Sequence, residues 1–76
     1  MLTFDISMHG PPNTDVQSGG SYGRYDENGN LSFRTDTTGR AHYIKELKDY
    51  FLPHTHHFSW KLINGVWRYV QKIWPV

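Results

Sequence analysis

The sequence predicts an α+β fold, in which one helix packs on a small antiparallel sheet of about four strands built from two Asn-Gly hairpins. The dipeptides at 28–29 and 64–65 each lie between segments rich in aromatic residues, and Asn-Gly is the strongest short-range sign of a β-hairpin. Between the two hairpins lies a segment whose apolar residues recur at helical spacing. The hairpins therefore supply the strands, and the intervening segment supplies the helix.

Residues 1–20 are expected to form a flexible N-terminal segment, and residues 21–76 a single domain. The stretch HGPPNTDVQSGG is rich in Gly, Pro, Asn, Asp and Ser, which is the composition of a loop or linker. A chain of 76 residues is long enough for one domain with a thin core. The first hairpin is predicted with arms at 22–25 and 31–35, joined by a type I′ turn.

The helix is predicted over residues 40–51. Lys45 and Asp49 lie four residues apart, where opposite charges on a helix attract, and Pro53 ends the helix because proline disfavours helical geometry at the residue before it. The apolar side chains would form one stripe for packing on the sheet, at Tyr43, Ile44, Leu47, Tyr50 and Phe51.

The second hairpin has a clear register. A two-residue turn at 64–65 places Lys61 opposite Arg68. The same register places His57 opposite Lys72, and like charges across paired strands cost up to about 1 kcal/mol. An anion bound across this face would relieve the repulsion; side chains that extend into water would tolerate it. The opposite face is predicted to be the core face, formed by Phe58, Trp60, Leu62, Trp67, Tyr69 and Ile73.

The C-terminal third of the chain is cationic. The formal net charge is only +1, but no carboxylate side chain follows Asp49. A cationic surface favours anionic partners, so RNA is the expected partner. The residues predicted to bind nucleic acid are Arg40, His57, Lys61, Arg68 and Lys72.

Composition also excludes several kinds of site. The chain has no cysteine, which rules out disulfides and thiolate metal sites. The N-terminal stretch MLTFDISMHGPP lacks the basic start and apolar run of a signal peptide, and no segment is long enough to span a membrane. We therefore expect a cytoplasmic protein, monomeric or homodimeric, without membrane contact and without a cofactor.

The stretch LPHTHHFSW holds three of the 5 histidines. His54 and His56 project to the same side if this segment is extended. RNA cleavage by its own 2′-hydroxyl needs a base, an acid and a cation for the phosphorane charge, and it needs no metal. Histidine suits the first two tasks and arginine the third. The predicted catalytic residues are therefore His54, His56, His42, Asp36 and Arg34, with Asp36 orienting an imidazole.

Other interpretations of the same residues stay open. Asp36 can cap a turn instead, and a histidine-rich segment before a strand can have no chemical role. His54, His56 and His57 can hold a metal ion such as Zn²⁺. A further alternative is a non-enzymatic module that binds a protein, such as an inhibitor, or that self-associates through its exposed C-terminal strand.

Residues 22–60 resemble the small C-terminal toxin domains of bacterial polymorphic toxin systems of the Rhs type. The likeness rests on three short motifs: Tyr25, Asp26, Asn28 and Gly29; Asp36 and Thr38; and Pro53, His54, His56 and Phe58. The resemblance implies a nuclease with a helix-plus-antiparallel-sheet fold, and a catalytic or substrate-binding role for Asp36, His54 and His56, with Arg34 and His42 beside them. The adjacent His57 and the apolar segment at 43–51 depart from that pattern.

Overall fold

The computed structural model describes residues 2–3 and 6–76, and this part of the chain contains strands but no helix. The predicted α+β fold is therefore wrong, and the protein is an all-β structure. Its strands are β1 (Leu2–Thr3), β2 (Asp15–Ser18), β3 (Ser21–Tyr25), β4 (Leu31–Asp36), β5 (His42–Ile44), β6 (Asp49–Phe51), β7 (His54–Ile63) and β8 (Val66–Pro75).

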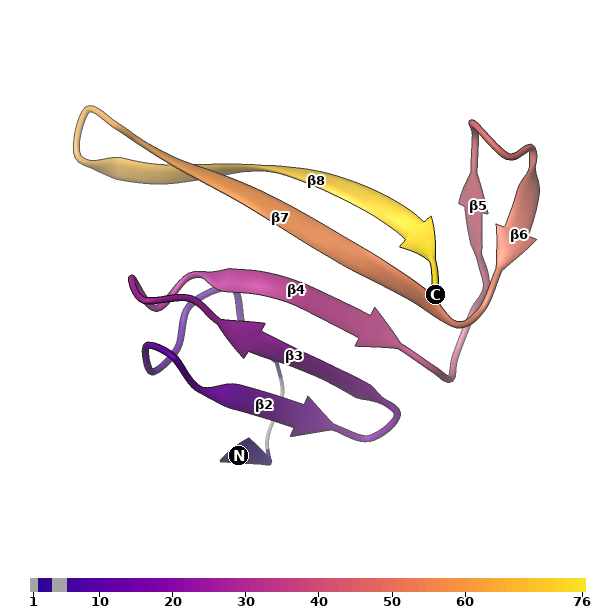
Figure 1. Ribbon diagram of the computed structural model, residues 1–76, viewed down its shortest axis with the longest axis horizontal. Coiled ribbons are helices and arrows are strands. Elements are labelled where there is room, and N and C mark those ends of the chain that lie inside the picture. The colour runs from indigo at the N-terminus through magenta and orange to yellow at the C-terminus, as the bar shows by residue number, and fades with distance from the viewer. Residues whose placement is uncertain (1, 4–5) are drawn as a thin grey trace.

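The strands form one large sheet and one small hairpin (Figure 1). The large sheet has the order β1-β2-β3-β4-β7-β8, in which β1 pairs with β2 in parallel and all other neighbours are antiparallel. The β5–β6 hairpin is inserted between β4 and β7 and stands at the end of the sheet (Figure 1). In the part of the chain that the structure describes, no helix could cross a bilayer.

The segment predicted to be a helix forms the β5–β6 hairpin instead. Tyr43 pairs with Tyr50 across the two strands, with their ring centroids 5.1 Å apart. One helical turn survives in the loop, where the amide of Lys48 donates to the carbonyl of Ile44 at 2.8 Å, but Lys48 has a φ of 55°, which ends it. A helix this short is marginal alone, and β-branched and aromatic side chains favour strands.

The two Asn-Gly turns differ in geometry. In the β7–β8 turn both Asn64 and Gly65 have positive φ, 50° and 76°, which is type I′ geometry, and Ile63 pairs with Val66, which confirms the predicted two-residue turn. In the β3–β4 turn only Gly29 has a positive φ, 74°. There the Asp26 carboxylate accepts the amides of Asn28 and Asn30 at 2.8 and 3.0 Å, so a longer loop replaces the predicted two-residue turn.

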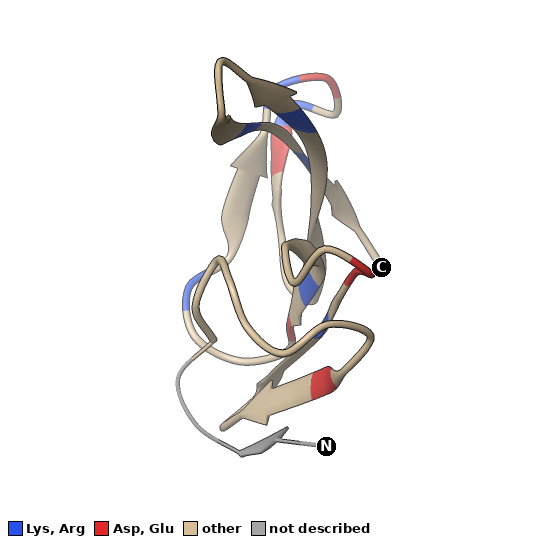
Figure 2. Ribbon diagram, turned by 90° about the vertical axis from the view of Figure 1, so that its left-hand side faces the viewer, with Lys and Arg blue, Asp and Glu red and all other residues tan. Residues whose placement is uncertain are grey.

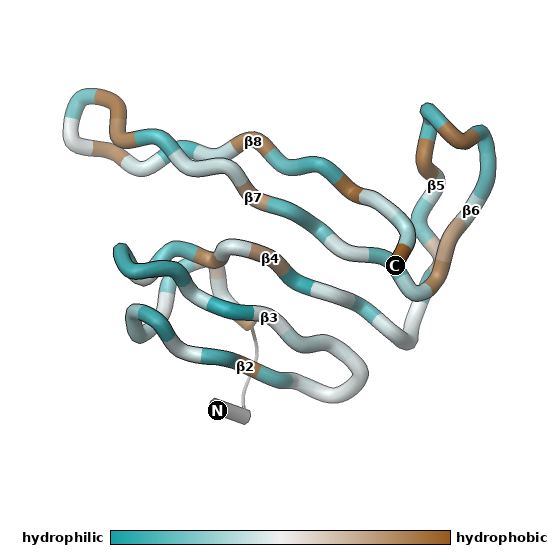
Figure 3. Tube along the Cα trace, viewed as in Figure 1, coloured by the Kyte–Doolittle hydropathy of each residue, from teal (hydrophilic) through white to brown (hydrophobic). Residues whose placement is uncertain are grey.

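The register predicted for the second hairpin is confirmed. Lys61 pairs with Arg68, and His57 with Lys72. The predicted core face is only partly buried, since Leu62 is 58% exposed and Tyr69 46% exposed. The reason is that β4 pairs with β7 only along residues 54–57, so the outer half of the hairpin extends beyond the sheet, with a hydrophobic tip (Figures 1 and 3).

The core lies between the sheet and the N-terminal segment. Val16, Tyr25 and Leu31 are fully buried, and Ile6, Met8 and Phe58 pack against them. The chain that covers them is anchored by backbone hydrogen bonds, such as that from the Leu31 amide to the Met8 carbonyl. Residues 6–20, which composition predicts to be a flexible segment, therefore contribute to the core, and the expected boundary at residue 20 falls between two paired strands, β2 and β3.

Candidate functional site

The end of β4 and the start of β7 bring together four of the polar residues predicted to be catalytic. Arg34 pairs with His56 and Asp36 with His54 in the antiparallel ladder. Because side chains two residues apart on a strand share a face, all four project from the same face of the sheet. His54 is 3% and His56 8% exposed, so the cluster is largely shielded from water.

The carboxylate of Asp36 is the centre of the cluster. Its Oδ1 accepts hydrogen bonds from Ser21 Oγ at 2.6 Å and from Arg34 Nε at 3.1 Å. Its Oδ2 lies 3.3 Å from Arg34 Nη2, so the guanidinium contacts both carboxylate oxygens. Such two-point contacts fix the carboxylate's orientation as well as its charge.

His54 is held between two hydrogen-bond acceptors. Its Nδ1 lies 3.1 Å from the carbonyl oxygen of Phe51, and its Nε2 lies 3.2 Å from Asp36 Oδ2. A neutral imidazole has one N–H and can donate only one of these bonds, whereas the imidazolium can donate both. The two contacts fix the orientation of the ring between the end of β6 and Asp36.

His56 has a different environment. Its Nδ1 lies 3.2 Å from Gln71 Oε1, and its Nε2 lies 3.1 Å from Asp36 Oδ2 and 3.2 Å from Arg34 Nη2. Arginine is a donor and never an acceptor. With its proton on Nδ1, the neutral ring donates to Gln71 and accepts from Arg34 through Nε2.

The pKa values at this site have identifiable causes. Burial lowers the pKa of His56 and the nearby Arg34 charge lowers it further, which outweighs the hydrogen bond to Gln71. Burial raises the pKa of Asp36, but the hydrogen bond from Ser21 and the Arg34 charge outweigh burial and leave that pKa below its ordinary value. The ground state therefore pairs an ionised Asp36 with a neutral His56 at neutral pH.

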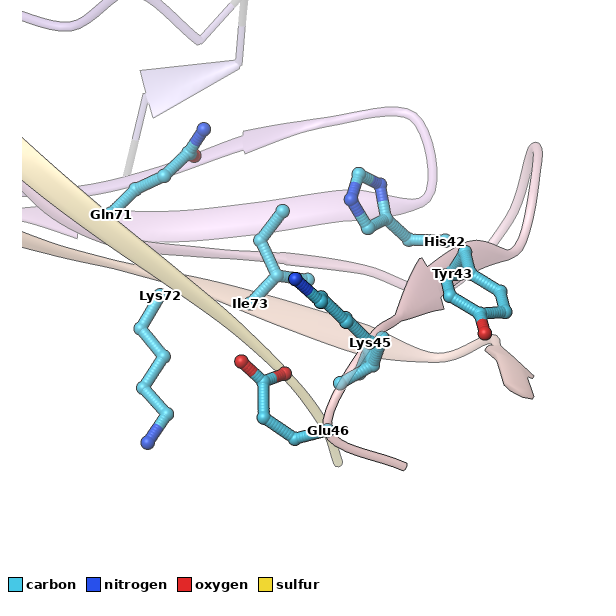
Figure 4. A pocket seen from close by; sticks show the side chains of 8 residues that line it. His42, Tyr43, Lys45, Glu46, Gln71, Lys72 and Ile73 are labelled. Carbon is cyan, nitrogen blue, oxygen red and sulfur yellow. The ribbon is translucent and has the colours of Figure 1, made fainter. Parts of the chain in front are cut away.

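The β5–β6 hairpin adds the third imidazole. His42 and Ile44 project to the same side of β5, where Ile44 is 2% exposed. The ring centroid of His42 lies 5.6 Å from that of His54 and 5.9 Å from that of His56. Unlike the other two rings, His42 is exposed to water, and it lines an open pocket of about 350 Å³ between the hairpin and β8 (Figure 4).

A metal can in principle bind the same cluster. One potential ligand atom each of Asp36, His54 and His56 lies within 4.8 Å of the others, and two histidines with a carboxylate are a common metal-binding set. Arg34, however, donates to Asp36 and His56 at the point where these atoms converge, and its fixed charge disfavours a second cation there. His57, suggested by the sequence as a ligand, lies on the opposite face of β7, because side chains alternate along a strand.

The residues predicted to bind nucleic acid lie elsewhere. His57, Lys61, Arg68 and Lys72 share the face of the β7–β8 hairpin that points away from the site, and Arg40 is exposed in the loop between β4 and β5. Figure 2 shows lysine and arginine but no acidic residue on this hairpin. These four residues, His57, Lys61, Arg68 and Lys72, form the basic face of the hairpin. The basic face and the predicted catalytic residues of β4 and β7 thus lie on opposite faces of one sheet.

Two polar residues of the site, Ser21 and Gln71, are not among those predicted from the sequence. Gln71 was detectable, because the predicted register already places it opposite Phe58, on the same face as His56. Ser21 was not, because its pairing with Asp36 depends on the long β3–β4 register, which includes a shift between Arg24 and Tyr25. Both residues hold a catalytic candidate by a hydrogen bond.

The chain matches no known protein-family model, no curated protein and no solved structure. The function of the site is therefore inferred from its geometry.

The stability of the fold is expected to fall below about pH 6.5. The folded pKa of His56 is lowered, so the unfolded chain binds more protons than the folded chain in this range, and acid favours unfolding. The lowered pKa of Asp36 adds stability that is present above its unfolded pKa and is lost at lower pH. Urea unfolding at neutral and mildly acidic pH measures the effect. The variant His56→Gln should show a smaller loss near pH 6; an equal loss would contradict the assignment.

Proposed function

We propose that the protein cleaves RNA without a metal, by attack of the ribose 2′-hydroxyl on the adjacent phosphate. The observation that carries the proposal is the convergence of Arg34, Asp36, His42 and His56 from three separate segments at one end of the sheet. This set supplies the cation, base and acid that the reaction requires. The partial likeness to polymorphic toxin domains supports the same reaction class.

Arg34 is the proposed phosphate ligand. Its side chain is 32% exposed, and with Asp36 it lines an open cavity of about 420 Å³. The guanidinium also lies 3.2 Å from His56 Nε2. A phosphate bound to the outer edge of Arg34 would draw the guanidinium from His56 and free the Nε2 lone pair. Catalytic hydrogen bonds often rearrange in this way when substrate binds.

His56 is the proposed general base, because it is neutral and its Nε2 becomes an acceptor once Arg34 is engaged. It takes the proton of the 2′-hydroxyl while the 2′-oxygen bonds to phosphorus. The bond between phosphorus and the 5′-oxygen breaks, and His42, the exposed imidazole, donates a proton to that oxygen. The products are a 2′,3′-cyclic phosphate and a 5′-hydroxyl, and no other reactant is needed.

Asp36 and His54 are proposed positioning residues. Both ring nitrogens of His54 have partners, the Phe51 carbonyl and Asp36, so His54 supports the site instead of contacting a phosphate, although the sequence suggests a direct catalytic role. Its Nε2–H holds Asp36, and Asp36 orients Arg34, which donates to His56 Nε2. Second-layer contacts of this kind keep reacting groups in productive geometry.

The test is a time course of single-stranded RNA degradation by the purified protein, with and without EDTA, followed by analysis of the product ends. We expect equal cleavage in both conditions and a 2′,3′-cyclic phosphate end. Cleavage abolished by EDTA would assign Asp36, His54 and His56 to a metal instead. An intact substrate in every lane would contradict the proposal.

A second candidate function is a non-enzymatic interaction module. It is favoured by the exposed outer half of the β7–β8 hairpin, where Leu62, Val66 and Val70 are 58%, 52% and 75% exposed. Long apolar strands at the edge of a sheet attract other strands. Sedimentation over a range of protein concentrations distinguishes the two, since an oligomer without RNA affinity would support the module.

A further inference from the structure

We infer that the substrate is single-stranded RNA that crosses the free edge of β8, with one nucleobase in the pocket between β8 and the β5–β6 hairpin and the flanking phosphates on the basic face beyond it. This inference rests on the proposed function and specifies the substrate class. The basic face and the proposed catalytic residues lie on opposite faces of the sheet, and a strand that crosses the edge of β8 would contact both.

The connection between the two faces is the pocket of Figure 4. Gln71 and Lys72 are adjacent on β8 and project to opposite sides of the strand (Figure 4). Gln71 contacts His56, and Lys72 belongs to the basic face, yet both line this one pocket. A ligand in the pocket therefore touches both the catalytic side and the basic side of the sheet.

The edge at this place is free for a ligand to cross. Within the described residues, β8 is the last strand of the sheet and has a neighbour, β7, on one side only. The molecule is also thin, with a smallest extent of 14 Å. A flexible single strand can turn round such an edge, whereas nucleic-acid duplexes are stiff over lengths of about 50 nm.

The pocket has the size and the lining to hold a base. Its volume of about 350 Å³ is at the lower end of the range of about 300–1,000 Å³ for small-ligand sites. Rings and an amide line it, from His42, Tyr43 and Gln71, together with the carboxylate of Glu46 and the ammonium groups of Lys45 and Lys72. Single-stranded RNA is typically recognised in this manner, by stacking on aromatic rings and by hydrogen bonds to exposed base edges.

The basic face supplies contacts for the flanking phosphates. Lys61 and Arg68 are paired directly opposite each other, and the Lys72 ammonium lies 4.9 Å from the ring centroid of Trp74. Among the described residues, none of these three cations has an acidic partner within salt-bridge distance. Their repulsion is relieved by an anionic strand that passes over them.

The test measures RNA binding by fluorescence anisotropy in the chain of 76 residues that carries His56→Ala, so that the substrate survives. Lys72→Glu is expected to weaken binding of a trinucleotide by about tenfold. Lys61→Glu makes the same charge change near the tip of the hairpin, and should weaken binding of a decanucleotide but leave that of the trinucleotide within about twofold. A duplex of the decanucleotide sequence should bind at least about tenfold more weakly than the single strand.

If Lys72→Glu and Lys61→Glu weakened trinucleotide binding equally, the proposed path across the edge of β8 would be wrong. If the duplex bound as tightly as the single strand, the proposed substrate class would be wrong. Lys72-dependent binding of poly-L-glutamate without any preference for RNA would replace the inference with an acidic protein partner. The two proposals can fail separately. If the protein cleaves RNA but shows no such binding, only the path across the edge of β8 is contradicted. If binding depends on Lys72 as expected but RNA is never cleaved, only the proposed function is contradicted.

Discussion

Replacement of His56 by alanine is expected to slow RNA cleavage by about 10²–10⁴-fold, the usual contribution of a positioned general base. The imidazole removed is the one that faces both Asp36 and Arg34. Initial rates of cleavage of a fluorescent oligonucleotide measure the effect. Circular dichroism on the same samples shows whether the sheet is intact.

His9→Ala is the matched control for the loss of an imidazole. His9 lies outside the site, where it hydrogen bonds to Asn30 and contacts Trp60, so its replacement should change the cleavage rate no more than a few-fold. Equal losses in the two variants would mean that the fold, and not the chemistry, had been damaged. A folded His56→Ala protein with undiminished activity would refute the role of His56 as the base.

Tyr25→Ala is expected to destabilise the protein by about 3–5 kcal/mol, the range for truncation of a buried aromatic residue. Tyr25 is 0% exposed and belongs to the central apolar cluster, and its hydroxyl donates to the Ser7 carbonyl at 2.9 Å. A domain of this size has a total stability on the order of 4–11 kcal/mol, so much of the population would unfold. The midpoint of urea unfolding, followed by tryptophan fluorescence, measures the change.

Tyr22→Ala provides the comparison, because Tyr22 lies on the same strand, is 45% exposed and contacts Phe33 edge to face. Its loss should cost about 1 kcal/mol or less. If the two alanine variants unfolded at the same urea concentration, the core would not lie where the structure places it. Tyr25→Phe, which removes only the hydrogen bond, should fall between them.

The parts of the fold that could be predicted are those fixed by local geometry. Asn64-Gly65 sets the turn of the β7–β8 hairpin, and the turn sets every pair along ten-residue arms. Residues 40–51 illustrate the opposite case. Their apolar spacing fits a helix, but the burial of Ile44, which is 2% exposed, is a tertiary effect that local spacing does not contain.

The candidate site could likewise be predicted only in part from the sequence. The alternation of side chains along a strand is enough to place His54 and His56 together. Their meeting with Arg34 and Asp36 depends on the pairing of β4 with β7, across an insertion that sequence alone predicts as a helix. The separation of Lys61, Arg68 and Lys72 from His54 and His56 follows from side-chain alternation and the predicted β7–β8 register, whereas the place of Arg34 on the side of these two histidines depends on the pairing of β4 with β7.

The insertion of β5–β6 between the two strands that carry the cluster has a consequence for how such a protein can diversify. Arg34, Asp36 and His56 belong to the main sheet, while Tyr43, Lys45 and Glu46, which line the pocket, belong to the inserted hairpin. A change in the length or sequence of the hairpin would therefore alter what the pocket accepts and leave the paired strands in register. Under the proposed mechanism the hairpin also supplies the acid, His42 at the start of β5, so variation that keeps this residue would change selectivity while the base and the phosphate ligand stay on the main sheet.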